Sequence, residues 1–309
     1  MTETPDRRRV LECLGWAGTG ALFTLTGGVA ASVSLDHALA KPARSGVKPF
    51  SFVQVSDSHI GFGKDPNPDA RVTFREAVAK IKALLERPAF IIHTGDVSQL
   101  SRPAEFDDAD QILKEAGVPT FFVPGEHDML DEGQGQAFHT RFGSKTLGDG
   151  WYSFDHSGVH FIGLITVKEL KGGGQGHLGV DQLAWLRKDL SGRSASQPLV
   201  VFTHIPLWTI YEPWGWGVDD AEPALALLRR FGSVTVLNGH IHQVQQKVEG
   251  NITFHTARST AFPQPAPGSA PSPGPLKVAA EALRPSLGIR TVTVAQGRHP
   301  IALVDAPLA

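Results

Sequence analysis

The stretch FSFVQVSDSHI, residues 50–60, combines two patterns that together decide the fold. Its first part, Phe50–Val55, is a short apolar run of the kind that forms a buried β-strand. Two groups that bind metals or move protons, Asp57 and His59, follow directly after that run. A strand that ends in a carboxylate and an imidazole is the first indication that the chemistry of this chain lies at the edge of a sheet.

Four later segments repeat this arrangement of a β-like run followed by chemically active side chains. They are Phe90–His93 before Thr94-Gly95-Asp96, Thr120–Val123 before Pro124-Gly125-Glu126-His127-Asp128, Leu199–Thr203 before His204, and Val234–Leu237 before Asn238-Gly239-His240-Ile241-His242. Ligand sites in open α/β sheets lie at the carboxyl ends of strands. One such motif alone is typical of a turn or a cap. Five in order are hard to explain by turn chemistry, and we expect them to form one site.

The stretches between these strands predict an α/β fold. Helical spacing of apolar residues occurs in Arg71–Leu85, Glu105–Ala116, Gln182–Leu190 and Glu222–Arg230, and hairpins are expected within Trp151–Ile165 and Val244–His255. Strand–helix alternation followed by hairpins favours mixed sheets with helices outside. The glycine-rich segment Lys171–Gly179 and the proline-rich segment Ala261–Pro275 are interpreted as surface connections.

The spacing within the motifs also makes sense as metal coordination. In an extended segment residues i and i+2 point the same way, so Asp57 and His59 can converge on one ion, and His240 and His242 can line one side of a site. Glycines before Asp96, Glu126 and His240 permit tight turns. A mixture of carboxylate oxygen and imidazole nitrogen suits Mn, Fe, Zn, Co or Ni better than Ca.

This ordered set of motifs resembles the calcineurin-like metallophosphoesterases. The pattern of that family is Asp-x-His, Gly-Asp, Gly-Asn-His-Asp/Glu, a single His, and Gly-His-x-His. The corresponding segments are Asp57-Ser58-His59, Gly95-Asp96, Gly125-Glu126-His127-Asp128, His204 and Gly239-His240-Ile241-His242, which together span residues 57–242. The segment Val180–Leu186 also looks like the helix that the family carries between its third and fourth motifs.

The resemblance implies a four-layer α-β-β-α sandwich with mixed sheets, formed by residues 41–309, and a centre of two divalent or mixed-valence metal ions. By motif position, Asp57, His59, Asp96 and His242 would hold the first metal, and Asp96, Glu126, His204 and His240 the second. His127 would be the general acid and Asp128 a group that orients it. The implied activity is hydrolysis of a small phosphomonoester or phosphodiester by attack of a hydroxide that bridges the metals.

Position 126 departs from the family pattern, because Glu126 stands where the family has Asn. An ionised Glu adds a negative charge and cannot donate a hydrogen bond. Three outcomes are open: Glu126 is a ligand with altered metal preference, it turns away and leaves the second site weak, or the centre binds metal without efficient hydrolysis. Two function classes therefore remain, a phosphoesterase and a metal-binding protein that has kept the scaffold with weak or no phosphatase activity.

Residues 1–40 are interpreted as a bacterial export signal. Arg7-Arg8-Arg9-Val10-Leu11 resembles a twin-arginine motif, a charge-free stretch runs from Cys13 to Leu35, and Ala38-Leu39-Ala40 is a small-x-small cleavage site. The rival interpretation is an uncleaved membrane anchor, but the glycine and threonine content makes the stretch only weakly apolar. We therefore expect recognition by the twin-arginine export machinery, a periplasmic or secreted protein, and no stable membrane anchor after cleavage.

Composition further limits the kinds of partner and metal site that this chain can have. With 29 basic and 31 acidic residues the chain has no global positive charge, and a nucleic-acid polymer is not the expected partner. The single cysteine, Cys13, excludes an internal disulfide and any multi-cysteine metal site within the chain. The aromatic cluster Trp208, Tyr211, Trp214 and Trp216 could either wall the site or anchor its own loop. The histidines outside the motifs are taken as structural, with His177 the first to test as a site residue.

Overall fold

The computed structural model describes residues 22–26, 29–33, 49–144, 146–171, 174–295 and 301–309. Most of the proposed signal, residues 1–40, lies outside these described residues, so the signal stays a prediction. Two short strands fall within it, β1 (Leu22–Thr26) and β2 (Val29–Val33), which pair antiparallel with each other. Among the described residues, no helix has the length and apolar character needed to cross a membrane.

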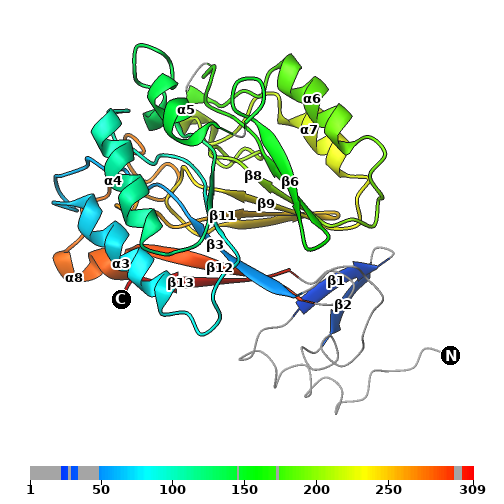
Figure 1. Ribbon diagram of the computed structural model, residues 1–309, viewed down its shortest axis with the longest axis horizontal. Helices are drawn as coiled ribbons and strands as arrows, with labels where there is room; N and C mark the ends of the chain where they lie inside the picture. Colours follow the sequence, from blue (N-terminus) through cyan, green and yellow to red (C-terminus); the bar gives the residue numbers. More distant parts are fainter. Residues whose placement is uncertain (1–21, 27–28, 34–48, 145, 172–173, 296–300) are drawn as a thin grey trace.

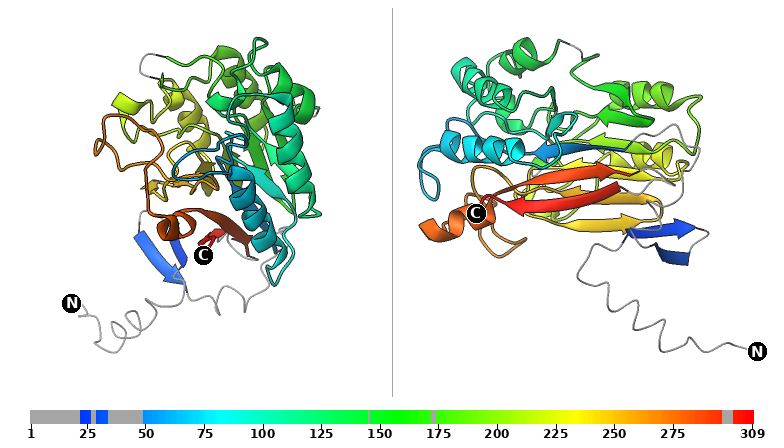
Figure 2. Two further views of the ribbon diagram at one scale, coloured as in Figure 1. Left: turned by 90° about the vertical axis from the view of Figure 1, so that its left-hand side faces the viewer. Right: turned by 60° about the horizontal axis from the view of Figure 1, so that its bottom comes forward.

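A five-stranded mixed sheet carries the first three motifs (Figure 1). Its strand order is β13-β12-β3-β4-β5, with β3 at Phe50–Val55, β4 at Ile91–His93, β5 at Thr120–Phe122, β12 at Gly288–Val294 and β13 at Ile301–Pro307. Strands β3, β4 and β5 are parallel, so their carboxyl ends meet at one edge. Strands β12 and β13 run side by side and pair antiparallel (Figure 2, right).

A six-stranded mixed sheet carries the last two motifs. Its order is β10-β11-β9-β8-β7-β6, with β6 at Tyr152–His156, β7 at Val159–Gly163, β8 at Leu199–Phe202, β9 at Val234–Asn238, β10 at Gln246–Glu249 and β11 at Ile252–Thr256. Strands β7, β8, β9 and β11 are parallel to their neighbours in that group, and the two outer pairs are antiparallel hairpins.

The alternation of side chains along β3 shows how the layers pack. Phe52 faces the other sheet, where its ring centroid lies 5.4 Å from that of Phe161 on β7. Val53 and Val55 face the opposite way and join the apolar cluster formed with the helices. This period of two is what a strand buried on both faces requires.

Helices cover the outer face of each sheet (Figure 1). On the five-stranded sheet these are α3 (Ala70–Lys82), α4 (Pro103–Lys114) and the short α5 (Gln136–Phe142). On the six-stranded sheet they are α6 (Val180–Leu190) and α7 (Ala221–Leu228), and α8 (Ala280–Ser286) contacts β13. The four-layer α-β-β-α sandwich expected from the sequence is therefore confirmed.

The proline-rich segment Ala261–Pro275 was wrongly interpreted as a surface connection along its whole length. Its first residues are buried, Ala261 at 0% and Phe262 at 5% exposure, whereas the stretch 266–269 is exposed. Phe262 packs on Phe62, with ring centroids 4.4 Å apart. The segment thus begins inside the molecule, next to the motifs.

Candidate metal centre

All seven side chains predicted as metal ligands meet at the carboxyl ends of the central strands. Their ligand atoms fall into overlapping groups, each lying within 4.8 Å. One group, the first trio, is Asp57, His59 and His242; another, the second trio, is Glu126, His204 and His240. Asp96 lies between them, with Oδ2 3.4 Å from His59 Nε2 and 3.5 Å from His204 Nε2.

The first trio is compact and dry. His59 Nε2 lies 3.3 Å from His242 Nε2, and the latter lies 3.3 Å from Asp57 Oδ1. None of the three side chains is more than 2% exposed. In this low-dielectric setting their charges and lone pairs interact strongly.

The second trio is built around the carboxylate of Glu126. Its Oε2 lies 2.8 Å from His204 Nε2, and its Oε1 lies 3.0 Å from His240 Nδ1. The two imidazole nitrogens are 3.2 Å apart. Glu126 thus points into the centre, and of the three outcomes left open above, the geometry disfavours the one in which it turns away.

The backbone directs the ligands by a route that extended-chain reasoning missed. Strands β3 and β9 end at Val55 and Asn238, before their motifs, so the alternation of a strand does not aim these side chains. Five ligand residues have left-handed φ values instead: Asp57 (51°), His59 (41°), Asp96 (53°), His240 (71°) and His242 (53°). Such conformations are costly for non-glycine residues and gather at functional sites. The side chains lie close together as expected, but the left-handed backbone, rather than the alternation of an extended strand, brings them there.

The glycines of the motifs provide space as well as conformational freedom. Gly95 has φ +91°, and a Cβ there would lie 2.5 Å from His204 Nδ1. At Gly125 a Cβ would lie 2.1 Å from Asp96 Oδ1, and at Gly239 it would lie 2.0 Å from Ser56 Oγ. Close approach of the loops to one another, rather than turn geometry alone, requires glycine at the last two positions.

Hydrogen bonds at the back of two rings set which nitrogen faces the centre. His242 Nδ1 donates to the Phe262 carbonyl at 2.6 Å, and His204 Nδ1 donates to the Thr94 carbonyl at 2.8 Å. In the neutral rings this leaves the Nε2 lone pairs facing inward, toward carboxylate oxygens and other nitrogens. Without a cation, burial lowers the pKa of His204, but the carboxylates of Asp96 and Glu126 outweigh burial and raise that pKa well above its ordinary value, so that a proton holds the His204–Glu126 contact. A bound cation would take the place of that proton.

Two further observations fit a cation. Asp57 Oδ2 and His240 Nε2 are buried, and neither finds a hydrogen-bond partner among the described residues. Burial and the neighbouring Glu126 carboxylate raise the pKa of Asp96 well above its usual range. Burial would also raise the pKa of Glu126, but the facing His240 and His204 outweigh it and hold that pKa well below the ordinary value. The donor set therefore fits metal ions bound by carboxylate and imidazole.

His127 lies against this cluster. Its main-chain N–H donates to Asp96 Oδ1 at 2.9 Å, and its ring centroid lies 4.8 Å from that of His59. Ring atom Nδ1 donates to the Gln99 carbonyl at 2.8 Å. Burial lowers the pKa of His127, but the carboxylates of Asp96 and Glu126 outweigh burial and raise it overall. The imidazole is thus suited to hold a proton beside the centre.

Comparison with known proteins agrees with this geometry. Residues 50–244 match the family model described as calcineurin-like phosphoesterase. The chain belongs to the calcineurin-like phosphoesterase family. This membership makes it a metal-dependent phosphoric ester hydrolase, and the resemblance read from the motifs is confirmed.

Relatives and solved structures add detail. The chain is 29% identical to a probable cyclic nucleotide phosphodiesterase of a Synechococcus species over 70% of this chain and 83% of the relative. It is 27% identical to the glycerophosphodiester phosphodiesterase GpdQ of Enterobacter lignolyticus over 62% and 69%. A dimetal phosphatase from Danio rerio shares the fold at a TM-score of 0.61 and 15% identity, covering 83% of this chain and 98% of that one.

Asp128 makes its hydrogen bonds to the main chain around His127 rather than to the ring of His127. Its carboxylate accepts from the main-chain N–H groups of Val97, Ser98 and Gly125, at 2.8–3.0 Å, and from the hydroxyl of Ser98 at 2.9 Å. The ring of His127 is instead held by the Gln99 carbonyl. Asp128 therefore ties the loop of this phosphoesterase that carries Glu126 and His127 to the loop that carries Asp96.

Sequence reasoning missed the residues that support the ligands. Phe262 contributes its carbonyl to His242, and its ring centroid lies 4.7 Å from those of both His59 and His242. Ser259 Oγ donates to the Asp57 carbonyl at 2.8 Å. No motif marks either residue, although a phenylalanine within a polar, proline-rich stretch is a weak signal of anchoring.

The remaining candidates make other contacts in this fold. Trp216 is fully buried and packs edge-on against Trp214, which favours the interpretation that the aromatic loop anchors itself. His177 Nδ1 lies 2.7 Å from Asp219 Oδ1, in a group separate from the two trios. His160 lies between Asp155 and Asp189, 3.0 and 2.7 Å from their carboxylates.

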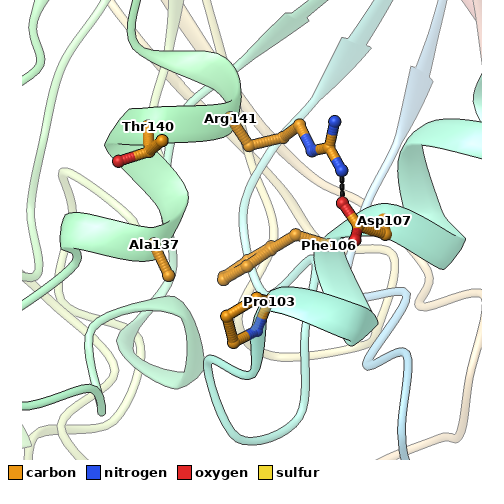
Figure 3. A pocket seen from close by; sticks show the side chains of 6 residues that line it. All are labelled: Pro103, Phe106, Asp107, Ala137, Thr140 and Arg141. Carbon is orange, nitrogen blue, oxygen red and sulfur yellow. Dashed lines mark ion pairs between the residues drawn. The ribbon is translucent and has the colours of Figure 1, made fainter.

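A pocket of about 330 Å³ lies away from the candidate ligands, between α4 and α5 (Figure 3). Its lining includes the Arg141–Asp107 ion pair and the ring of Phe106. None of the seven candidate ligands lines this pocket, so its size does not make it the reactive site of the phosphoesterase.

Proposed function

We propose that this chain hydrolyses a small phosphodiester at a dinuclear metal centre. The observation that carries the proposal is the pair of ligand trios, one buried and one partly exposed, that meet at Asp96. Asp57, His59, His242 and Asp96 would hold one ion, and Asp96, Glu126, His204 and His240 the other. Bound metals of the Mn, Fe, Zn, Co or Ni type supply activation of a water molecule and neutralisation of phosphate charge.

The chain's own residues supply positioning and a proton. His127, whose Nδ1 is engaged by the Gln99 carbonyl, presents Nε2 as the atom that donates to the departing oxygen. Asp128 and Asp96 fix the loop of His127 through main-chain hydrogen bonds. Protonation of the leaving group matters most when that group is a poor one, such as an alkoxide.

Charge supports a diester rather than a monoester. Asp57, Asp96 and Glu126 put three carboxylates into one cluster. A phosphomonoester carries about −1.5 to −2 at pH 7, and a diester carries a single negative charge, so these carboxylates repel the monoester more. The relatives named above are described as phosphodiesterases, which supports the same substrate class.

The second candidate is a metal-binding protein on this scaffold with weak or no phosphatase activity. Glu126 favours it, because the glutamate faces both His204 and His240 and offers the substrate no hydrogen-bond donor when ionised. The wild type and Glu126→Asn separate the two candidates when metal content and rates on an aryl phosphomonoester and an aryl phosphodiester are measured.

For the diesterase we expect metal in both proteins, a wild-type preference for the diester, and a preference that falls by roughly tenfold in Glu126→Asn, equivalent to about 1.4 kcal/mol. A wild type that holds metal and turns over neither ester would support the metal-binding protein. If Glu126→Asn changed neither metal content nor the ratio of rates, Glu126 would not determine specificity.

We further propose that residues 1–40 direct twin-arginine export to the periplasm or beyond. The support is the layout of the sequence, in which Arg7-Arg8 precede a charge-free stretch and a small-x-small site. A reporter fused after residue 45 should be exported from a bacterial host with an intact twin-arginine pathway. The double substitution Arg7→Lys and Arg8→Lys should retain it in the cytoplasm, and continued export would contradict the proposal.

A further inference from the structure

A buried arginine lies outside the segment that matches the family. Arg290 on β12 is 1% exposed, and its guanidinium donates twice to Asp305 on β13, each at 2.9 Å. It also donates to the Thr256 carbonyl at 2.9 Å and to Gln54 Oε1 at 3.2 Å. Because Thr256 ends β11, this one cation joins the two sheets.

Arg290 fixes the orientation of the Gln54 amide. Arginine only donates hydrogen bonds, so the amide atom that faces it is the oxygen, and the NH₂ group points the other way. That group donates to Thr94 Oγ1 at 3.1 Å and to the Asn238 carbonyl at 3.2 Å. Gln54 is fully buried, and both ends of its amide are thus engaged.

The two acceptors of Gln54 lie at the base of ligand loops from different sheets. Thr94 precedes Gly95 and Asp96, and its carbonyl accepts from His204 Nδ1 at 2.8 Å. Asn238 precedes Gly239 and His240, and its side chain donates to the Gly239 carbonyl at 2.9 Å. A single amide therefore connects the backbone beneath Asp96, His204 and His240.

We infer that Gln54, held by Arg290, is a positioning residue that sets the geometry of the second trio. The inference rests on the proposed metal centre. Buried ion pairs are weak contributors to stability, and apolar replacements are often as stable. A fully satisfied polar network suits a site whose ligands come from two sheets and must hold one arrangement.

The variant Gln54→Glu tests the donor role of the amide. A carboxylate of the same size keeps the contact with Arg290 but cannot donate to Thr94 or Asn238 when ionised. The full chain is titrated with cobalt(II) while its visible absorption and thermal unfolding are recorded. We expect one of two cobalt equivalents to bind about tenfold more weakly or worse, with altered absorption bands, and the other to be unchanged.

Gln182→Glu is the matched control. Gln182 is 2% exposed, and its amide makes three hydrogen bonds to the main chain of Ile165 and Leu178, neither of which adjoins a candidate ligand. This variant should unfold at a lower temperature and bind cobalt as the wild type does. Equal weakening of cobalt binding in both variants would overturn the inference, because it would report general loosening of the fold.

The outcomes separate this inference from the proposed function. A wild type that binds no cobalt removes the metal centre and the inference with it. A wild type that binds two equivalents, beside a Gln54→Glu protein with the same affinities and spectrum, overturns the inference alone. If Gln54→Glu does not fold, Thr94→Val removes one of the two hydrogen bonds that the Gln54 amide donates, together with the bond from Thr94 Oγ1 to Ser56 Oγ, while keeping the carbonyl that holds His204. Wild-type cobalt binding by Thr94→Val would then be the contradicting result.

Discussion

The two trios of the centre use the same kinds of ligand atom in different surroundings. The side chains of the first trio are at most 2% exposed, whereas Glu126 is 26% exposed and His240 11%. The difference has a visible cause: Phe262 from the proline-rich segment lies over His59 and His242, and its ring excludes water from that half. His127 is partly exposed, and its ring lies beside His59, with the two ring centroids 4.8 Å apart.

This difference in exposure indicates different roles for the two trios. A dry site strengthens the interaction between ligand and metal charges, because the effective dielectric constant is low. The half that meets solvent is where a substrate can enter, and the partly exposed ring of His127 reaches the centre from beside His59 and Asp96. We therefore expect the first trio to act mainly as an anchor, and the second trio with Glu126 to determine which ester is accepted.

Removal of the shared ligand Asp96 should have the largest effect, because both trios depend on it. Asp96 lies within 3.5 Å of an imidazole of each half and also accepts the main-chain N–H of His127. We expect Asp96→Ala to lose metal from both halves and with it essentially all hydrolysis, as measured by elemental analysis and an aryl diester assay. Asp108→Asn, at a surface carboxylate on α4, is the control. An Asp96→Ala protein that kept both metals would contradict the bridging assignment.

Removal of the proton donor His127 should slow the chemistry and leave metal binding intact. We expect His127→Ala to retain metal, because His127 is not needed in either trio, and to lose roughly 10²–10⁴-fold in kcat on an alkyl diester. The loss should be much smaller on a nitrophenyl diester, whose leaving group needs little protonation. Steady-state rates on both substrates with metal analysis provide the check. Metal loss that matched the activity loss would make His127 structural.

Much of the fold could be predicted because each central strand is a short apolar run that local sequence reveals. Phe50–Val55 was predicted with the bounds it has, and the other motif strands to within about two residues. Strand β12 and its partner β13 were not predicted as elements. Arg290 interrupts the apolar pattern of β12, and its burial is tolerable because Asp305, on a strand further along the chain, pairs with it while Gln54 and Thr256 accept its other hydrogen bonds. Local periodicity does not reveal such a long-range ion pair.

In the candidate site, too, the local features could be predicted and the long-range contacts could not. Its seven ligands and His127 could be named from motif positions, because each motif is local. Their supports could not, since Gln54 meets Arg290 across 236 positions and Asn238 across 184. The left-handed backbone at Asp57 and His59 was also hidden, because non-glycine residues adopt it only when tertiary contacts over-determine the turn.

The smallest expected effect concerns the base of the first half, and it is a pH dependence. His93 is fully buried at the end of β4, with Nε2 2.9 Å from the hydroxyl of Ser58, which stands between Asp57 and His59. Burial lowers the pKa of His93 to about 3 from an ordinary value of 6.5. Between these values the unfolded chain binds a proton that the folded chain does not, so stability is present above pH 6.5 and is lost as the pH falls toward 3.

As the pH falls from 6.5 toward 3, the contribution of His93 to the free energy of unfolding should therefore decline by about 1.4 kcal/mol per pH unit. Urea unfolding at several pH values between 7 and 4 measures the slope, and His93→Gln supplies the reference because its side chain does not titrate. We expect the variant to be less stable at pH 7 and to lose stability less steeply on acidification. Ser58 lies between Asp57 and His59, two ligands of the first trio. In a cobalt titration at the same pH values, we therefore expect His93→Gln to bind one of the two cobalt equivalents more weakly than the wild type and the other equally well. Parallel slopes in wild type and variant would mean that the burial of His93 does not control the acid sensitivity of this half.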